Sequence, residues 1–167
     1  MNLPLYFIVI LYILIKHPNP DDSLLGGLFM AYIFTLASII PIIGIAILFK
    51  LTLTKLVSNT EPVPKIISRF FITVAIIEII PIILFVYGFA NLEIAASIEE
   101  VLVPAIILIL VLVVGYLFVF LQKKFTIEST NEESESASQI QVLPLIVIGL
   151  MSALPISSFV AMMMMLP

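Results

Sequence analysis

The sequence predicts an all-α protein, a polytopic bundle of membrane-spanning helices. Of its 167 residues, 62% are hydrophobic and only 11% are charged, and the mean hydropathy of +1.30 is far above that of a water-soluble domain. Four segments are apolar enough and long enough to cross the hydrocarbon of a bilayer, which takes about 20 helical residues. We therefore expect four transmembrane helices, preceded by a short hydrophobic helix.

The short hydrophobic helix is expected within residues 1–23. Its apolar run, Leu3 to Ile15, is too short for a comfortable span and is followed by Lys16 and the turn-forming sequence HPNPDD. It has neither the basic segment nor the small-residue cleavage site of a secretory signal. We expect an uncleaved short span or a helix in the membrane interface, and His17 is expected to be a solvated loop residue because no second histidine or cysteine can join it at a metal.

A first helical hairpin is expected at residues 24–92. Its arms are the uncharged segment Leu24 to Phe49, with a tail that reaches the headgroups, and the segment Phe70 to Asn91. Between them the sequence SNTEPVPK breaks the helix, because its prolines and polar residues favour a tight connection.

A second helical hairpin is expected at residues 101–167, after an outer acidic loop at 93–100. Its arms are Val101 to Gln122 and Leu143 to Leu166, both of spanning length. The connection between these arms, at 125–141, is rich in Glu, Ser, Thr and Asn, which is typical of a solvated loop.

Basic residues predict the orientation in the cell membrane, because Lys and Arg are enriched in short cytoplasmic loops. Of the 7 basic residues only Lys16 disagrees with a simple alternation. The others flank the connections near Glu61 and Glu132, which we therefore expect to be cytoplasmic, with the C-terminus outside: Lys50, Lys55, Lys65, Arg69, Lys123 and Lys124.

Glu78 is the one charge inside the segment Phe70 to Asn91, and it lies near the middle. A carboxylate at the centre of a bilayer costs roughly 2.5 to 3.5 kcal/mol on insertion scales, so such a residue by default marks a functional site. A low dielectric favours its neutral form, and ionisation is expected only when a basic partner or water approaches. A proton is a better cargo than sodium, because the isoleucines around Glu78 supply only backbone groups that the helix already uses.

Three of the segments share a pattern around proline, in which a polar or acidic residue lies three positions earlier. Proline leaves the carbonyl four residues before it without a helical partner. We expect the two serines to satisfy or soften these kinks, whereas a carboxyl is too costly for that purpose alone. The pairs are Ser38 with Pro41, Glu78 with Pro81, and Ser152 with Pro155.

The segment Glu61 to Phe89 resembles the polar loop and second helix of the c subunit of rotary ATP synthases, the proteolipid that forms the rotor ring. That helix commonly reads like VALVEALPII. The resemblance implies that Glu78 is the proton carrier, and that an arginine of a stator subunit supplies its counter-charge. The matching positions are Val74, Ala75, Glu78, Pro81, Ile82 and Ile83, with Phe71 and Phe89 at the flanks.

The chain departs from that family in two places. Ser58, Asn59 and Thr60 precede Glu61, whereas the family has Arg-Gln-Pro ahead of its glutamate. Gly44 alone remains of the glycine ladder that lets neighbouring helices of the ring pack closely.

The last segment resembles the same helix more weakly, with Ser152 where the carboxylate would stand. If this second resemblance is more than the chance similarity of apolar helices, Leu24 to Leu92 and Val101 to Leu166 are two fused hairpins after an extra helix. That arrangement is similar to the duplicated proteolipids of vacuolar-type ATPases, which keep one carboxyl per pair of hairpins.

The sequence lacks the residues that other kinds of function would require. There is no nucleotide-binding loop, no His or Cys cluster for a metal, no basic patch for nucleic acid, and no second intramembrane acid for a protease dyad. The run Met162 to Met165 points around the whole helix, so apolar filling is favoured over a copper site. We expect no catalytic residue and no cofactor.

Two functions stay open from the sequence. The first is a non-catalytic, proteolipid-like subunit that translocates protons through Glu78 in the membrane sector of a rotary ATPase, surrounded by lipid, other membrane subunits or further copies of itself. The second is a non-transporting scaffold or assembly protein derived from the same hairpin, in which protonated Glu78 makes an interhelical hydrogen bond.

Overall fold

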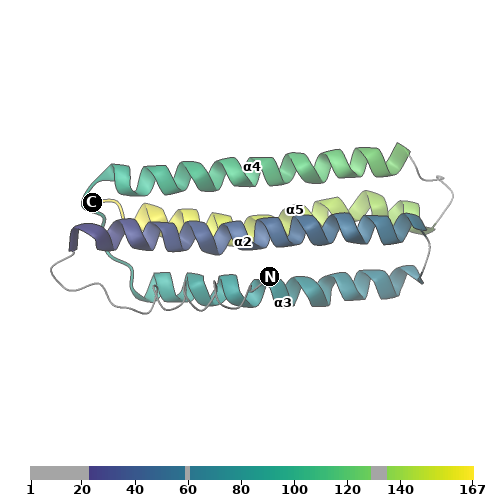
Figure 1. Cartoon of the computed structure of the whole chain (residues 1–167), viewed down its shortest axis with the longest axis horizontal. Helices are drawn as coiled ribbons and strands as arrows, with labels where there is room; N and C mark the ends of the chain where they lie inside the picture. Colours follow the sequence, from purple (N-terminus) through teal and green to yellow (C-terminus); the bar gives the residue numbers. More distant parts are fainter. Residues whose placement is uncertain (1–22, 59–60, 129–134) are drawn as a thin grey trace, which may run out of the picture.

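The computed structural model describes residues 23–58, 61–128 and 135–167, and this part of the chain is a bundle of long helices (Figure 1). The helices are α2 (Ser23–Ser58), α3 (Val63–Ala90), α4 (Ile98–Glu128) and α5 (Glu135–Met164). The predicted all-α bundle is therefore confirmed. The expected helix at Leu3 to Ile15, and His17 after it, lie outside the described residues.

Each of the four helices is long and apolar enough to cross a membrane. They contain 28 to 36 residues, which at about 1.5 Å per residue gives lengths of about 42 to 54 Å. The hydrocarbon core of a bilayer is only about 30 Å thick, so the helix ends extend into the headgroup region. The protein is a multi-pass helical membrane protein.

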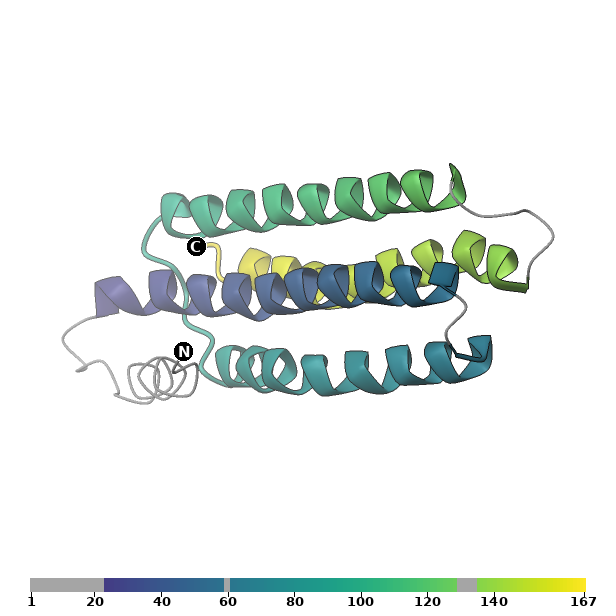
Figure 2. The ribbon, with the colours of Figure 1, turned by 45° about the vertical axis from the view of Figure 1, so that its right-hand side comes forward.

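Helix α2 is the centre of the bundle. It packs against α3, α4 and α5, whereas α3 and α4 do not contact each other in the described part of the chain (Figure 2). Half of the residues in the α2 span, 50%, are buried, against 22% in the α3 span. The first predicted hairpin therefore has one arm in the core and one arm at the periphery.

The buried side chains form two apolar clusters along the bundle axis. One contains Phe34 on α2 and Leu84 on α3, and it lies toward the end of the bundle where the 91–97 connection meets the C-terminal residues. The other contains Phe49 on α2 and Phe70 on α3, toward the end where α3 begins. We call these ends the Glu93 end and the Glu61 end.

The acidic residues of the Glu93 end contact the starts of helices. Glu93 lies against Gly26 in the first turn of α2 and leaves no room for a β-carbon there. Glu100 accepts a hydrogen bond of 3.1 Å from the Ala96 N–H just ahead of α4, and Glu99 lies in the same first turn. Carboxylates are favourable at these positions because the helix dipole is positive at its N-terminus.

The helices extend further into the second acidic connection than the sequence suggested. The expected loop was 125–141, but α4 continues to Glu128 and α5 begins at Glu135. Polar residues that follow a long apolar span can continue its helix, because each added residue gains a backbone hydrogen bond once the helix is nucleated.

Candidate functional site

Glu78 lies midway along α3, on the border between the buried and the exposed side of that helix. The buried stripe of α3 passes through Val74, four residues before Glu78, and Pro81, three residues after it. Ile79 and Ile82, on the outer side, are 54% and 46% exposed, and Glu78 itself is half-buried. Its carboxyl therefore lies at the edge of the contact between α2 and α3, within reach of a group outside the bundle.

Gly44 allows α3 to approach α2 at the level of Glu78. A β-carbon on Gly44 would lie 2.8 Å from Cγ2 of Ile77, the residue directly before Glu78. That separation is shorter than carbon atoms tolerate, so Ile77 fits only because the side chain at position 44 is absent. Gly44 thus packs against the other arm of its own hairpin.

Pro81 leaves a backbone acceptor free at the residue directly before Glu78. Because proline has no N–H, the carbonyl of Ile77 loses its helical partner. The middle of α3 therefore combines an ionisable oxygen pair at Glu78 with a carbonyl released at the preceding residue.

Glu78 has no partner among the residues that the structure describes. It forms no hydrogen bond or ion pair with them. In the same ranges no group of three His, Cys, Asp or Glu side chains could hold a metal ion. A carboxyl with these surroundings suits a proton, which needs one oxygen, better than a metal ion, which needs several ligands.

The structure does not join the two predicted serines to Glu78. Ser38 is fully buried and donates to the Phe34 carbonyl at 2.9 Å, and Ser152 bonds the carbonyl of Ile148. Each hydroxyl thus bonds the carbonyl four residues before itself. Pro41 and Pro155 release different carbonyls, those of the residues four before each proline, so the serines do not satisfy the groups that the prolines leave free.

Tyr116 forms a polar contact inside the bundle that sequence reasoning missed. Its hydroxyl lies 2.5 Å from Ser152 Oγ and joins α4 to α5. The adjacent Gly115 leaves no space for a β-carbon, which would meet Met151 and Ile42 at 2.7 and 2.8 Å. A tyrosine in the middle of an apolar span was the available signal, since a buried hydroxyl usually finds a partner.

Glu78 and the Tyr116–Ser152 pair lie at about the same depth in the bundle. Ile77 packs at Gly44 and Gly115 packs at Ile42, and these two positions are neighbours along α2. The pair is on the α4 and α5 side of α2, however, and Glu78 is on the α3 side. Helix α2 therefore separates Glu78 from the Tyr116–Ser152 pair.

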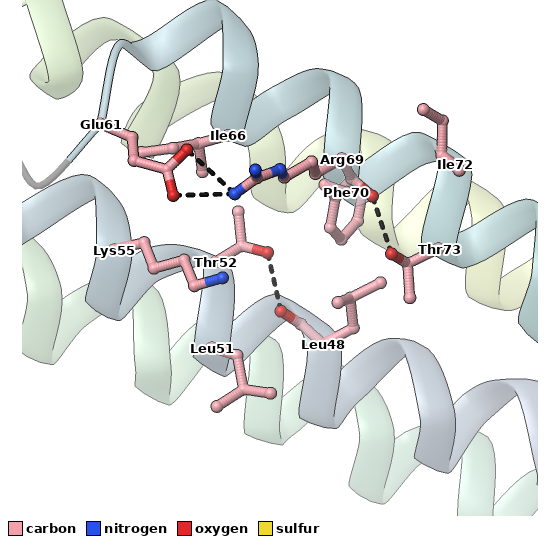
Figure 3. Close-up of a pocket in the computed structure, with 10 residues that line it drawn as sticks. All are labelled: Leu48, Leu51, Thr52, Lys55, Glu61, Ile66, Arg69, Phe70, Ile72 and Thr73. Carbon is pink, nitrogen blue, oxygen red and sulfur yellow. Dashed lines mark hydrogen bonds and ion pairs between the residues drawn. The ribbon is translucent and has the colours of Figure 1, made fainter.

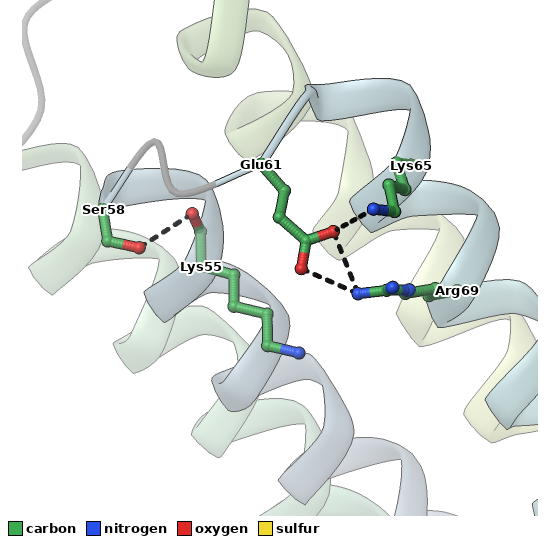
Figure 4. A network of polar contacts seen from close by, with 5 residues as sticks. All are labelled: Lys55, Ser58, Glu61, Lys65 and Arg69. Carbon is green, nitrogen blue, oxygen red and sulfur yellow. Dashed lines mark hydrogen bonds and ion pairs between the residues drawn. The ribbon is translucent and has the colours of Figure 1, made fainter.

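The Glu61 end carries a charged cluster at the start of α3 (Figure 4). The two carboxylate oxygens of Glu61 accept hydrogen bonds from Arg69 Nη1 at 2.7 and 2.9 Å, and Lys65 Nζ lies 3.3 Å from Oε2. The hydrogen bond from Lys65, with the positive charges of Arg69 and Lys65, lowers the pKa of Glu61 below its usual value of 4.5. Beside this cluster a pocket of about 270 Å³ opens between α2 and α3 (Figure 3).

No protein-family model matches the chain, and no curated protein or solved structure matches it either. The resemblance of residues 61–89 to a c subunit therefore stays a prediction from the sequence.

Proposed function

We propose that this protein is a proteolipid-like membrane subunit that carries protons on Glu78, as part of the membrane sector of a rotary ATPase. The observation that carries the proposal is the place of this carboxyl, half-buried midway along a 28-residue apolar helix and without a partner among the described residues. A permanently paired carboxyl would be held in one protonation state, whereas a carrier must both take up and release its proton.

The border position of Glu78 supports exchange with a second subunit. Because α3 is the least buried of the four spans, at 22%, its outer side is open to lipid or to another helix. A basic residue brought against this side would favour the ionised form, and its departure into lipid would favour the protonated form. This alternation is the step that we assign to Glu78.

The proposed orientation places the connections near Glu61 and Glu132 in the cytoplasm of the cell and the C-terminus outside. It rests on the basic residues that flank those two connections. Partners in this proposal are lipid, a subunit that supplies the basic residue, and further copies of the chain.

The proposal is tested by labelling the purified protein with a hydrophobic carbodiimide across pH. The reagent adds to a protonated carboxyl, so we expect selective modification of Glu78 that declines as pH rises. Mass spectrometry of the peptide that contains Glu78 measures it. Glu78→Gln should abolish the label, and Glu99→Gln, which alters an exposed carboxyl in the first turn of α4, should leave it unchanged.

Proton flux into liposomes that contain the assembled membrane sector tests the function directly. Glu78→Gln should stop the flux, and Glu78→Asp should retain part of it because the carboxyl is kept. If Glu78 is unlabelled at every pH and Glu78→Gln leaves flux intact, the proton-carrier proposal is wrong and the scaffold hypothesis takes its place.

A further inference from the structure

The pocket at the Glu61 end has a charged mouth. Lys55 on α2 and Arg69 on α3 both line it, together with Glu61, and Lys65 binds Glu61 from outside the pocket (Figure 3). Two cations contact this carboxylate and a third, Lys55, lines the same pocket, so the cluster has an excess of positive charge.

Two of the basic side chains keep donors that Glu61 does not use. Glu61 contacts Arg69 only through Nη1, although a guanidinium carries five N–H donors on three nitrogens. Lys55 forms no ion pair with a described residue, and Figure 4 shows its side chain extending from α2 alongside the Glu61–Arg69 pair. An anion at the mouth would therefore find an ammonium from one helix and free guanidinium donors from the other.

The wall of the pocket away from the charges is apolar. Phe70 and Ile66 are buried between the helices, and Leu48 lines the same wall. Leu51 and Ile72 are 55% and 59% exposed and continue this wall onto the outer side of the bundle. In a bilayer that outer side faces acyl chains, while the charged mouth lies near the helix ends, at headgroup level.

We propose that this pocket binds an anionic phospholipid, with the phosphate between Lys55 and Arg69 and one acyl chain along Leu51 and Ile72. Charge complementarity favours an anionic headgroup, and the apolar wall favours a lipid over a free phosphate or another water-soluble anion. The basic residue that α3 contributes, Arg69, lies nine residues before Glu78, and the proposed site does not depend on proton transport. A bound lipid bridges α2 to α3, the least buried helix, and should stabilise the hairpin.

Affinity is tested by native mass spectrometry and thermal unfolding of the whole protein in neutral detergent. The probes are phosphatidylglycerol, phosphatidylcholine with the same acyl chains, and inorganic phosphate. We expect phosphatidylglycerol to be retained and to raise Tm, and neither phosphatidylcholine nor inorganic phosphate to do so. Lys55→Gln should weaken retention about fivefold, as expected for one basic residue near an anionic headgroup.

Lys50→Gln is the matched control, because Lys50 is an exposed lysine of the same helix that does not line this pocket. Circular dichroism verifies that both variants fold. Equal retention of the two lipids, or an equal loss in both variants, would overturn the site. A rise in Tm with inorganic phosphate that matches phosphatidylglycerol would assign the pocket to a free anion instead.

The position of the acyl chain is tested by fluorescence, since the protein contains no tryptophan. Ile72→Trp places a single reporter in the wall of the pocket, and Ile109→Trp places one at an exposed position of α4. Phosphatidylglycerol with brominated chains should quench the reporter at 72 more strongly than brominated phosphatidylcholine, and the two lipids should quench the reporter at 109 equally. Equal quenching by both lipids at 72 would contradict the proposed pose.

Discussion

Glycines set the distance between α2 and α3. Gly44 accommodates Ile77, and Gly88 accommodates Phe34 and Ile33, whose atoms would lie 3.1 to 3.2 Å from an added β-carbon. Gly44 lies on α2 at the level of Glu78, and Gly88 lies on α3 ten residues after Glu78. The position of the Glu78 carboxyl at the border between α2 and α3 therefore depends on the lack of side chains at Gly44 and Gly88.

Gly44→Val should destabilise the bundle and displace α3 beside Glu78. The new methyl groups would overlap Ile77, and overpacking of this kind typically costs about 1 to 3 kcal/mol. A lower Tm in detergent measures the effect, and carbodiimide labelling of Glu78 should change along with it.

Gly149→Val is the matched control for Gly44→Val. Nothing lies within 4 Å of a β-carbon placed on Gly149, so its Tm should stay close to that of the parent protein. Equal losses of Tm in the two variants would mean that helix propensity, and not the Gly44–Ile77 contact, is responsible.

The first turns of α3 are fixed to the preceding connection by Glu61. Pro62 and Pro64 favour the start of a helix, because proline has no N–H and the first residues of a helix do not need one. The Pro62 carbonyl accepts a hydrogen bond from the N–H of Lys65 at 3.0 Å. Glu61 then reaches across two turns to Arg69. These contacts determine where the peripheral arm of the hairpin begins.

The contribution of Glu61 should depend on pH. Its pKa in the folded protein is lowered, so the stability that it contributes is present above the usual value of 4.5 and is lost as pH falls through the lowered pKa. Tm of the parent protein and of Glu61→Gln should therefore differ at pH 7 and converge at strongly acidic pH. Added salt should also reduce the difference, because the ion pairs are exposed.

Glu99→Gln serves as the control for that comparison, since Glu99 has no ion pair with a described residue. A difference between the parent protein and Glu61→Gln that persists unchanged from neutral to acidic pH would show that the ion pairs do not stabilise α3.

The bundle as a whole is uneven, with a central α2 and a peripheral α3. If the two hairpins were equivalent, α2 would correspond to α4 and α3 to α5. The described parts of α2 and α5 contact each other, whereas those of α3 and α4 do not. Exchanging the first hairpin for the second would therefore not reproduce the same contacts. An ancient duplication stays a prediction from the sequence, and the packing is not that of two equivalent halves.

Hydrogen exchange in detergent should reveal this unevenness. Backbone amides in the middle of α3 should exchange faster than those in the middle of α2, because only 22% of the α3 span is buried, against 50% of the α2 span. Mass spectrometry of peptides from each helix measures the rates. Equal protection of the two helices would indicate that α3 has a further partner in solution.

Composition and the length of the apolar segments were enough to predict four spanning helices, because lipid leaves the backbone few alternatives. They were not enough to predict which helix is central, since Leu24 to Phe49 and Val101 to Gln122 are both uncharged and both long enough to span. Glu78 could be found as an isolated charge, but the fit of Ile77 at Gly44 depends on contact between helices. The pocket at the Glu61 end was missed for the same reason, because Lys55 and Arg69 line one pocket only when α2 and α3 pack.

The central position of α2 has a consequence for biogenesis. Of the four described helices α2 is the first to be synthesised, and the later ones all pack on it. Each helix that enters the membrane therefore finds its main docking surface already in place, and α3 can settle before α4 exists because the two share no contact. Chains usually fold from the N-terminus as they are made, and this order of packing lets the bundle assemble without later rearrangement.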